Sequence, residues 1–160
     1  MPELLIRPVG PADHGLVVRL LERSWGATTV VAHGTLFDAA TLPGLVAERD
    51  GQPVGLLTYR LDGDGLEVVT IDADPPHGGA GSALLAAARQ LALHAGVRRL
   101  WLVTTNDNLD ALRFYQRRGL RLVRVSPGAL DVARQLKPGI PAVGAYGIPL
   151  RDELTLELTL

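Results

Sequence analysis

The residues best suited to chemistry in this 160-residue chain gather in two stretches. In the first, PPHGGAGSALL at residues 75–85, two prolines and three glycines lead into an alanine- and leucine-rich helical pattern. The N–H groups at a helix N-terminus bind anions, and glycines let a ligand approach the backbone closely. A tight turn without any ligand would also explain this stretch. The second stretch, TTNDNLDALRFYQRRGLRLV at residues 104–123, carries Asn108 and Tyr115 on a predicted helix.

Two nucleotide-binding patterns do not fit the glycine stretch. A P-loop needs Gly-Lys-Ser/Thr, but Gly81 is followed directly by Ser82, and no lysine is near. A dinucleotide fingerprint needs a third glycine where Leu84 stands. A third pattern, Gln/Arg-x-x-Gly-x-Gly/Ala of acyl-CoA-dependent transferases, is matched from Gly79 onward. Pro76 occupies its first position, so a polar contact is missing there.

The two stretches together resemble the GNAT superfamily of N-acetyltransferases, over about residues 45–125. The family signature Asn-x-x-Ala-x-x-Phe/Tyr-Tyr-x-x-x-Gly-Phe is matched at all but its last position, where Leu120 replaces Phe; the matching residues are Asn108, Ala111, Phe114, Tyr115 and Gly119. The resemblance implies an α/β, GNAT-like fold. This fold has a mixed, mostly antiparallel sheet with splayed central parallel strands, and helices on both faces.

The resemblance also implies direct transfer of acetyl from acetyl-CoA, as co-substrate, to a primary amine. Backbone N–H groups of the loop would hold the CoA diphosphate, the main chain of the preceding strand would pair with the pantetheine arm, and the Asn108 amide would reach the cofactor. Those positions are Ile71, Asp72, Ala73, Gly78, Gly79, Ala80, Gly81, Ser82 and Asn108. Asn108 is equally suited to be the N-cap of its helix.

Tyr115 matches the family's general acid and would protonate the leaving thiolate. A phenol of pKa about 10 is close enough to a thiol of pKa about 8.5 to share a proton with it. The amine must first lose a proton, and Glu67 is the preferred base, with Asp72, His33 and His77 as alternatives. Glu67 is equally well read as an exposed strand residue beside a turn. Tyr115 packing against the sheet together with Phe114 is the alternative to its catalytic role.

The elements that must position these residues follow from hydrophobic periodicity and from turn residues. Strands are predicted at 4–9, 45–48, 54–61, 66–73, 100–104, 120–125 and 154–160, with 45–73 as an antiparallel meander. Helices are predicted from Pro11 and at 81–95, 108–118 and 129–136. Residues 26–42 are ambiguous, and 138–149 form a long loop. Strict alternation in the strand 66–73 places Glu67 and Val69 on one face, and Val68, Thr70 and Asp72 on the other.

Composition narrows the class of protein. The net charge of −1 gives no support for binding nucleic acid or an anionic membrane, and no run approaches a membrane-spanning length. With no cysteine, disulfides, thiolate nucleophiles and a cysteine-borne acyl-enzyme are excluded. The four histidines form no metal-ligand spacing, so no metal is expected.

We therefore expect a single cytoplasmic acetyltransferase domain over residues 1–160. Its partner would be a small-molecule or peptide amine acceptor, selected by residues 25–42 and 135–153. A homodimer is common in the family the chain resembles, but nothing in the sequence demonstrates one. The alternatives are a non-catalytic CoA-binding or regulatory module on the same fold, and a transferase that uses another acyl-CoA or a hydroxyl acceptor.

Overall fold

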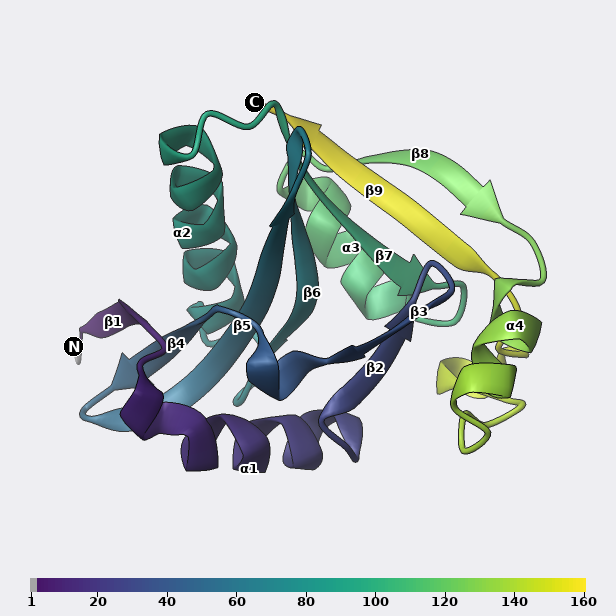
Figure 1. The fold of residues 1–160 in the computed structure, drawn as a ribbon, viewed down its shortest axis with the longest axis horizontal. Coiled ribbons are helices and arrows are strands. Elements are labelled where there is room, and N and C mark those ends of the chain that lie inside the picture. The colour runs from purple at the N-terminus through teal and green to yellow at the C-terminus, as the bar shows by residue number, and fades with distance from the viewer. Residues whose placement is uncertain (1–2) are drawn as a thin grey trace. The chain divides into compact units, whose positions relative to one another are not determined.

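Strands and helices follow along residues 3–160, the part of the chain that the computed structural model describes, in the order that the sequence predicts (Figure 1). They divide into two compact units, which are described separately. The first contains the residues up to Val30, together with Asp38–Leu100 and Leu160; the second contains Val31–Phe37 and Trp101–Thr159. A single domain over the whole chain stays a prediction.

The first unit is built on an antiparallel sheet. Its elements are β1 (Leu4–Pro8), α1 (His14–Trp25), β4 (Gly44–Arg49), β5 (Gln52–Asp62), β6 (Gly65–Ala73) and α2 (Ala80–His94). Neighbouring strands pair in the order β1-β4-β5-β6, and every pair is antiparallel. The two-residue link Asp50-Gly51 has positive φ at both positions, which is the turn whose twist suits adjacent antiparallel strands. The predicted meander is confirmed.

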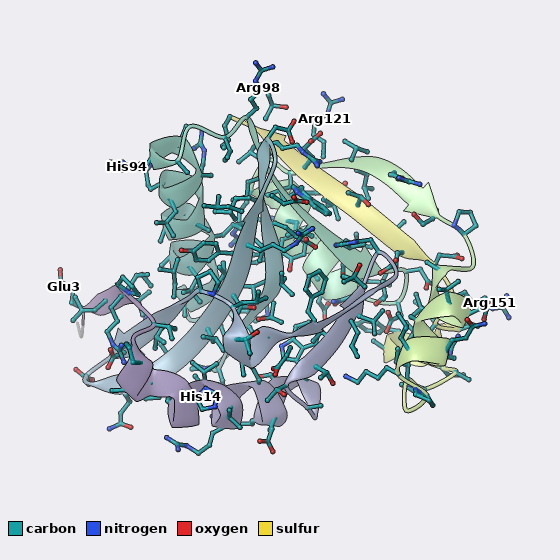
Figure 2. All side chains as sticks on the ribbon, viewed as in Figure 1. Glu3, His14, His94, Arg98, Arg121 and Arg151 are labelled. Atoms are coloured by element: carbon teal, nitrogen blue, oxygen red, sulfur yellow. The ribbon has the colours of Figure 1, made fainter. Side chains whose placement is uncertain are left out.

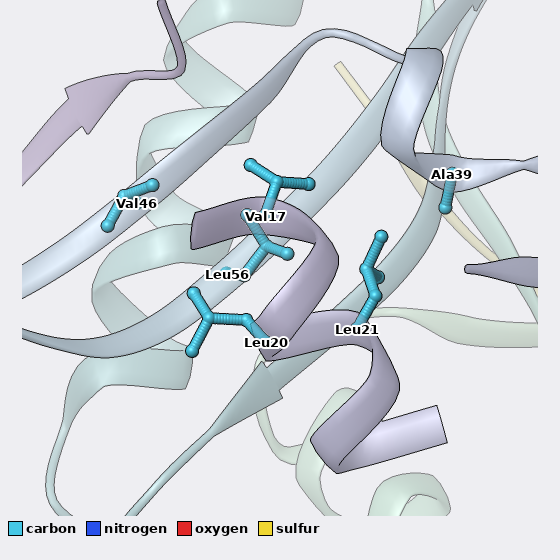
Figure 3. Packing of buried hydrophobic residues seen from close by; sticks show 6 residues of the cluster. All are labelled: Val17, Leu20, Leu21, Ala39, Val46 and Leu56. Atoms are coloured by element: carbon cyan, nitrogen blue, oxygen red, sulfur yellow. The ribbon is translucent and has the colours of Figure 1, made fainter. Parts of the chain in front are cut away.

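The helices α1 and α2 cover opposite faces of this sheet. Val17, Leu20 and Leu21 of α1 are buried with Ala39, Val46 and Leu56 in one apolar cluster (Figure 3). Gly55, which precedes Leu56 on β5, faces the opposite side of the sheet, since a Cβ built on it would lie 2.9 Å from Leu84 Cδ1 of α2. Only glycine therefore allows α2 to approach β5 this closely.

A β-bulge interrupts β6 and overturns the predicted alternation. Thr58 is paired with Thr70, but the next residue, Tyr59, is paired with Val68, so Val69 is an extra residue on β6. An extra residue reverses the sidedness of everything beyond it. Glu67 consequently shares a face with Thr70 and Asp72, and placing it with Val69 was wrong. This is also the face covered by α1, because Asp72 is paired with Leu56.

The second unit contains the segments that the sequence described least well. Its elements are most of β7 (Arg99–Thr105), then α3 (Leu109–Arg117), β8 (Arg121–Ser126), α4 (Ala129–Leu136) and β9 (Glu153–Thr159). β8 and β9 are antiparallel. The ambiguous segment forms a hairpin of β2 (Thr29–Ala32) and β3 (Thr35–Asp38), of which Val31–Phe37 belong to this unit. The short 3-10 turn that follows β3 belongs to the first unit. Leu130, Ala133 and Leu150 form a small core beneath α4, against which Val31 and Ile140 pack.

Among residues 3–160, no helix is both long enough and apolar enough to cross a membrane.

The cluster beneath α1 should carry a large share of the stability. Leu56 is fully buried, whereas Leu5 on the edge strand β1 is 62% exposed. We expect Leu56→Ala to lower the free energy of unfolding by about 2–5 kcal/mol, since it leaves a cavity. Leu5→Ala, the matched control, should change it by at most about 0.5 kcal/mol. Urea unfolding followed by circular dichroism measures both, and equal losses would contradict this account of the core.

Candidate active site

The loop that connects β6 to α2 has the geometry of an anion site. Gly79 is the N-cap of α2 with φ of +90°, and a Cβ at this position would have no atom within 4 Å. The first helical hydrogen bond runs from Ala83 N to Gly79 O, at 3.1 Å. Ala80 and Gly81 come before Ala83 in the first turn of α2, where N–H groups lack a partner within the helix. Open space and helix-end N–H groups therefore meet at one place.

Arg49 contacts this loop, which the sequence did not predict. It ends β4, and its Nη2 donates to Gly78 O at 2.9 Å. Pro76, at the position where the transferase pattern has Gln or Arg, is exposed. No local signal points to Arg49, because the contact joins residues 29 positions apart.

The Asp72 carboxylate is held by the end of α1. Its Oδ1 accepts from Ser24 Oγ at 3.0 Å, and its Oδ2 accepts from Trp25 Nε1 at 3.1 Å. Burial raises the pKa of this carboxyl, and the hydrogen bonds from Trp25 and Ser24 partly oppose the rise. Asp72 is thus better able to accept a proton near neutral pH than an ordinary aspartate.

Glu67 is fully buried, so the alternative of an exposed residue beside a turn was wrong. Its Oε1 accepts from Arg60 Nε at 2.6 Å, and the two residues are cross-strand partners. Thr58 and Thr70 are the next cross-strand pair on this face, and their hydroxyl oxygens lie 2.6 Å apart. A row of polar side chains therefore extends along the α1 face of β5 and β6, from the buried Glu67 to the half-buried Asp72.

In the second unit, Asn108 and Tyr115 are placed by α3. Asn108 is the N-cap: its Oδ1 accepts from Ala111 N at 3.4 Å, and its Nδ2 donates to Thr104 Oγ1 at 3.2 Å. The capping role predicted as one of its two possible roles is confirmed. Tyr115 is 8% exposed, and its ring packs edge-on against Phe114 with the centroids 5.4 Å apart. The sequence predicted packing of Tyr115 and Phe114 against the sheet as the alternative to catalysis, and the contact between the two rings is present.

The polar run that precedes α3 anchors the long proline-containing loop, a role that the sequence did not reveal. Asn106 Oδ1 accepts from Arg151 N and Asp152 N, both at 3.0 Å. Asp107 is buried and accepts from Ala145 N at 2.8 Å. A Cβ on Gly144 would lie 2.1 Å from Asp107 Oδ2, so only glycine fits there.

Tyr146 sits in the same loop and donates its hydroxyl to Asp110 Oδ1 at 2.7 Å. This hydrogen bond raises the pKa of Tyr146. Hydrogen bonds therefore attach the loop to the residues that precede and begin α3.

The histidines are dispersed. His14 begins α1 and His94 ends α2, with both labelled in Figure 2. His77 lies in the glycine loop with φ of +66°, and the exposed His33 contacts the rings of Phe37 and Trp101. Within residues 3–160, no three histidine, aspartate or glutamate side chains gather as metal ligands.

Three comparisons with known proteins bear on this geometry. Residues 17–120 match the family model described as the acetyltransferase (GNAT) family. The Bacillus subtilis protein YdhI is 35% identical over 152 residues, which cover 94% of this chain and 95% of YdhI.

Solved structures share the fold. An IAA acetyltransferase from Bacillus cereus superposes with a TM-score of 0.72 at 19% identity, covering 99% of this chain and 100% of that one. A GNAT family acetyltransferase from Elizabethkingia anophelis, with acetyl-CoA bound, gives 0.70 at 18% identity and covers 98% of each chain. The predicted α/β fold class is confirmed.

Substitution of Asn108 tests its capping role. We expect Asn108→Ala to lower the free energy of unfolding by about 1 kcal/mol, because the cap of α3 is lost. Asn108→Asp keeps an acceptor for Ala111 N and should retain most of that stability. Thermal unfolding measures both variants, and an Asp variant as unstable as the Ala variant would contradict the capping role.

The raised pKa of Asp72 predicts a pH dependence of stability. Above about pH 4 the unfolded chain loses this proton before the folded chain does, so the folded state binds more protons. The wild type should therefore lose stability relative to Asp72→Asn as pH rises from about 4. Urea unfolding at a series of pH values measures the difference, with the exposed Asp74→Asn as control. A difference that grows in the opposite direction would show that burial does not dominate.

Proposed function

The chain belongs to the acetyltransferase (GNAT) family, and from this premise we propose that it moves acetyl from acetyl-CoA directly to a primary amine. One observation carries the choice of co-substrate: the first turn of α2 has N–H groups without a partner inside the helix, and the Cβ position of Gly79 beside them is open space. Such an end attracts the negative charge of a diphosphate. The Elizabethkingia anophelis protein of similar fold has acetyl-CoA bound, which supports the same assignment.

The proposed cofactor contacts are those implied by the family resemblance. The backbone from Gly78 to Ser82 would bind the diphosphate, and the main chain at residues 71–73 would pair with the pantetheine arm. The observed N-cap role of Asn108 is compatible with a further contact to the cofactor, which remains part of the proposal.

We assign Tyr115 as the general acid. When the amine attacks the thioester carbonyl, the carbon–sulfur bond breaks and the sulfur leaves as a thiolate that needs a proton. The phenol of Tyr115 would supply it. Its edge-on packing against Phe114 supports this role, because a fixed ring holds its hydroxyl in one direction.

We propose that one of two carboxylates is the base that deprotonates the amine. Glu67 remains the first candidate, and its Oε1 is engaged by Arg60. Asp72 lies on the same face of β6, and burial raises its pKa. Selection of the acceptor by residues 25–42 and 135–153 stays a prediction.

The test of this function is consumption of acetyl-CoA in the presence of polyamines, amino acids, aminoglycosides and peptides, together with calorimetry of CoA binding. We expect CoA to bind and at least one amine to be acetylated. Binding without transfer to any amine would replace the proposal by a non-catalytic CoA-binding module. Absence of CoA binding up to millimolar concentration would reject the co-substrate.

Tyr115→Phe tests the acid. Removing the hydroxyl should lower kcat by about 100-fold with the best amine and leave the KM for acetyl-CoA unchanged, because proton transfer matters only in the transition state. Tyr59→Phe on β5 makes the same chemical change elsewhere and should keep kcat. Unchanged turnover in Tyr115→Phe would remove the residue from the mechanism.

A further inference from the structure

The guanidinium of Arg49 lies against the glycine loop from outside it. Its Nη2 donates to Gly78 O at 2.9 Å, and its Nη1 lies 3.5 Å from where a Cβ on Gly78 would stand. Such a Cβ would also lie 3.3 Å from Pro75 O, so Gly78 fills a narrow space between Pro75 and Arg49. The end of β4 thus bears directly on the loop.

This hydrogen bond fixes the direction of a neighbouring N–H group. In a planar trans peptide the carbonyl and the following N–H point in opposite directions. Because the Gly78 carbonyl points at Arg49, the Gly79 N–H points away from it. Gly79 itself, at φ of +90°, is a residue of high conformational freedom, so a contact that restrains its peptide has more to restrain. The Arg49 hydrogen bond therefore restrains the peptide between Gly78 and Gly79.

Arg49 also brings charge that the loop lacks. Pro76 has no charge and no N–H to donate, and no lysine or arginine lies within residues 73–82. A guanidinium stays protonated at every pH at which proteins fold. Its neighbour Glu48 is paired with Arg7, whereas no carboxylate within residues 3–160 pairs with Arg49. Its positive charge is therefore not neutralised by an ion pair.

We propose that Arg49 is a positioning residue for the diphosphate of acetyl-CoA: it holds the Gly78 peptide so that the following N–H faces away from the guanidinium, and it places a positive charge behind a loop that has no lysine or arginine of its own. This inference rests on the proposed binding of CoA at residues 78–82. It assigns support of the loop to a strand outside the loop.

The test compares Arg49→Met, Arg49→Lys and the control Arg89→Met, which removes the same charge from an exposed position on α2. We expect Arg49→Met to weaken CoA binding about tenfold in calorimetry, the typical effect of one charge-assisted hydrogen bond. The KM for acetyl-CoA should rise with kcat unchanged. Arg49→Lys should fall between the wild type and Arg49→Met, since it keeps the charge but not the planar donors.

A second substrate separates positioning from general loss of structure. S-acetyl-pantetheine has the thioester and the pantetheine arm but no diphosphate, so its KM should be the same in Arg49→Met and wild type. Two results would overturn the role of Arg49 but not the proposed function. One is an equal rise in KM for both substrates in Arg49→Met, and the other is a CoA affinity of Arg49→Met within twofold of that of Arg89→Met. No CoA binding by the wild type would overturn the proposed function, and this inference with it. Melting temperatures of all variants confirm that each is folded.

Discussion

The pairing of β6 with β5 is the constraint on which the first unit depends. The bulge at Val69 turns Glu67 toward the same face as Thr70 and Asp72, where α1 covers the sheet. Carboxylates shielded from water need partners, and both have them: Arg60 for the buried Glu67, and Ser24 and Trp25 for the half-buried Asp72. A single extra residue in one strand thereby gathers both candidate bases on one surface.

The glycine loop depends on support from elsewhere in the first unit. Gly79 gives the backbone its left-handed turn, but the direction of the adjoining peptide is held by Arg49 from the end of β4. The tight Asp50-Gly51 turn fixes where β4 ends and β5 begins, and so where that guanidinium stands. Arg49, on a strand of the sheet, thus restrains the glycines of the loop. Such restraint before binding lowers the entropic cost of binding.

The second unit uses the same principle at the beginning of α3. Asn106 and Asp107 accept backbone N–H groups of the proline-containing loop, while Asn108 caps the helix. Three consecutive polar residues therefore have local and long-range partners at once. These hydrogen bonds connect the loop to the start of the helix that carries Tyr115, so we expect a displacement of the loop to displace the start of that helix as well.

Local patterns in the sequence determined the meander, the bounds of α4, the positive-φ turns and the cap of α3, because periodicity, glycine and asparagine act within a few residues. The family signature around Tyr115 likewise lies on one short helix and the residues at its two ends. The tertiary structure alone decided the bulge at Val69, the hydrogen bond from Arg49 to Gly78, and the fit of Gly144 over Asp107. The last two join segments far apart in the chain, and the bulge depends on the register of two paired strands. Strand register and side-chain reach depend on how whole elements pack, and no local pattern records that packing.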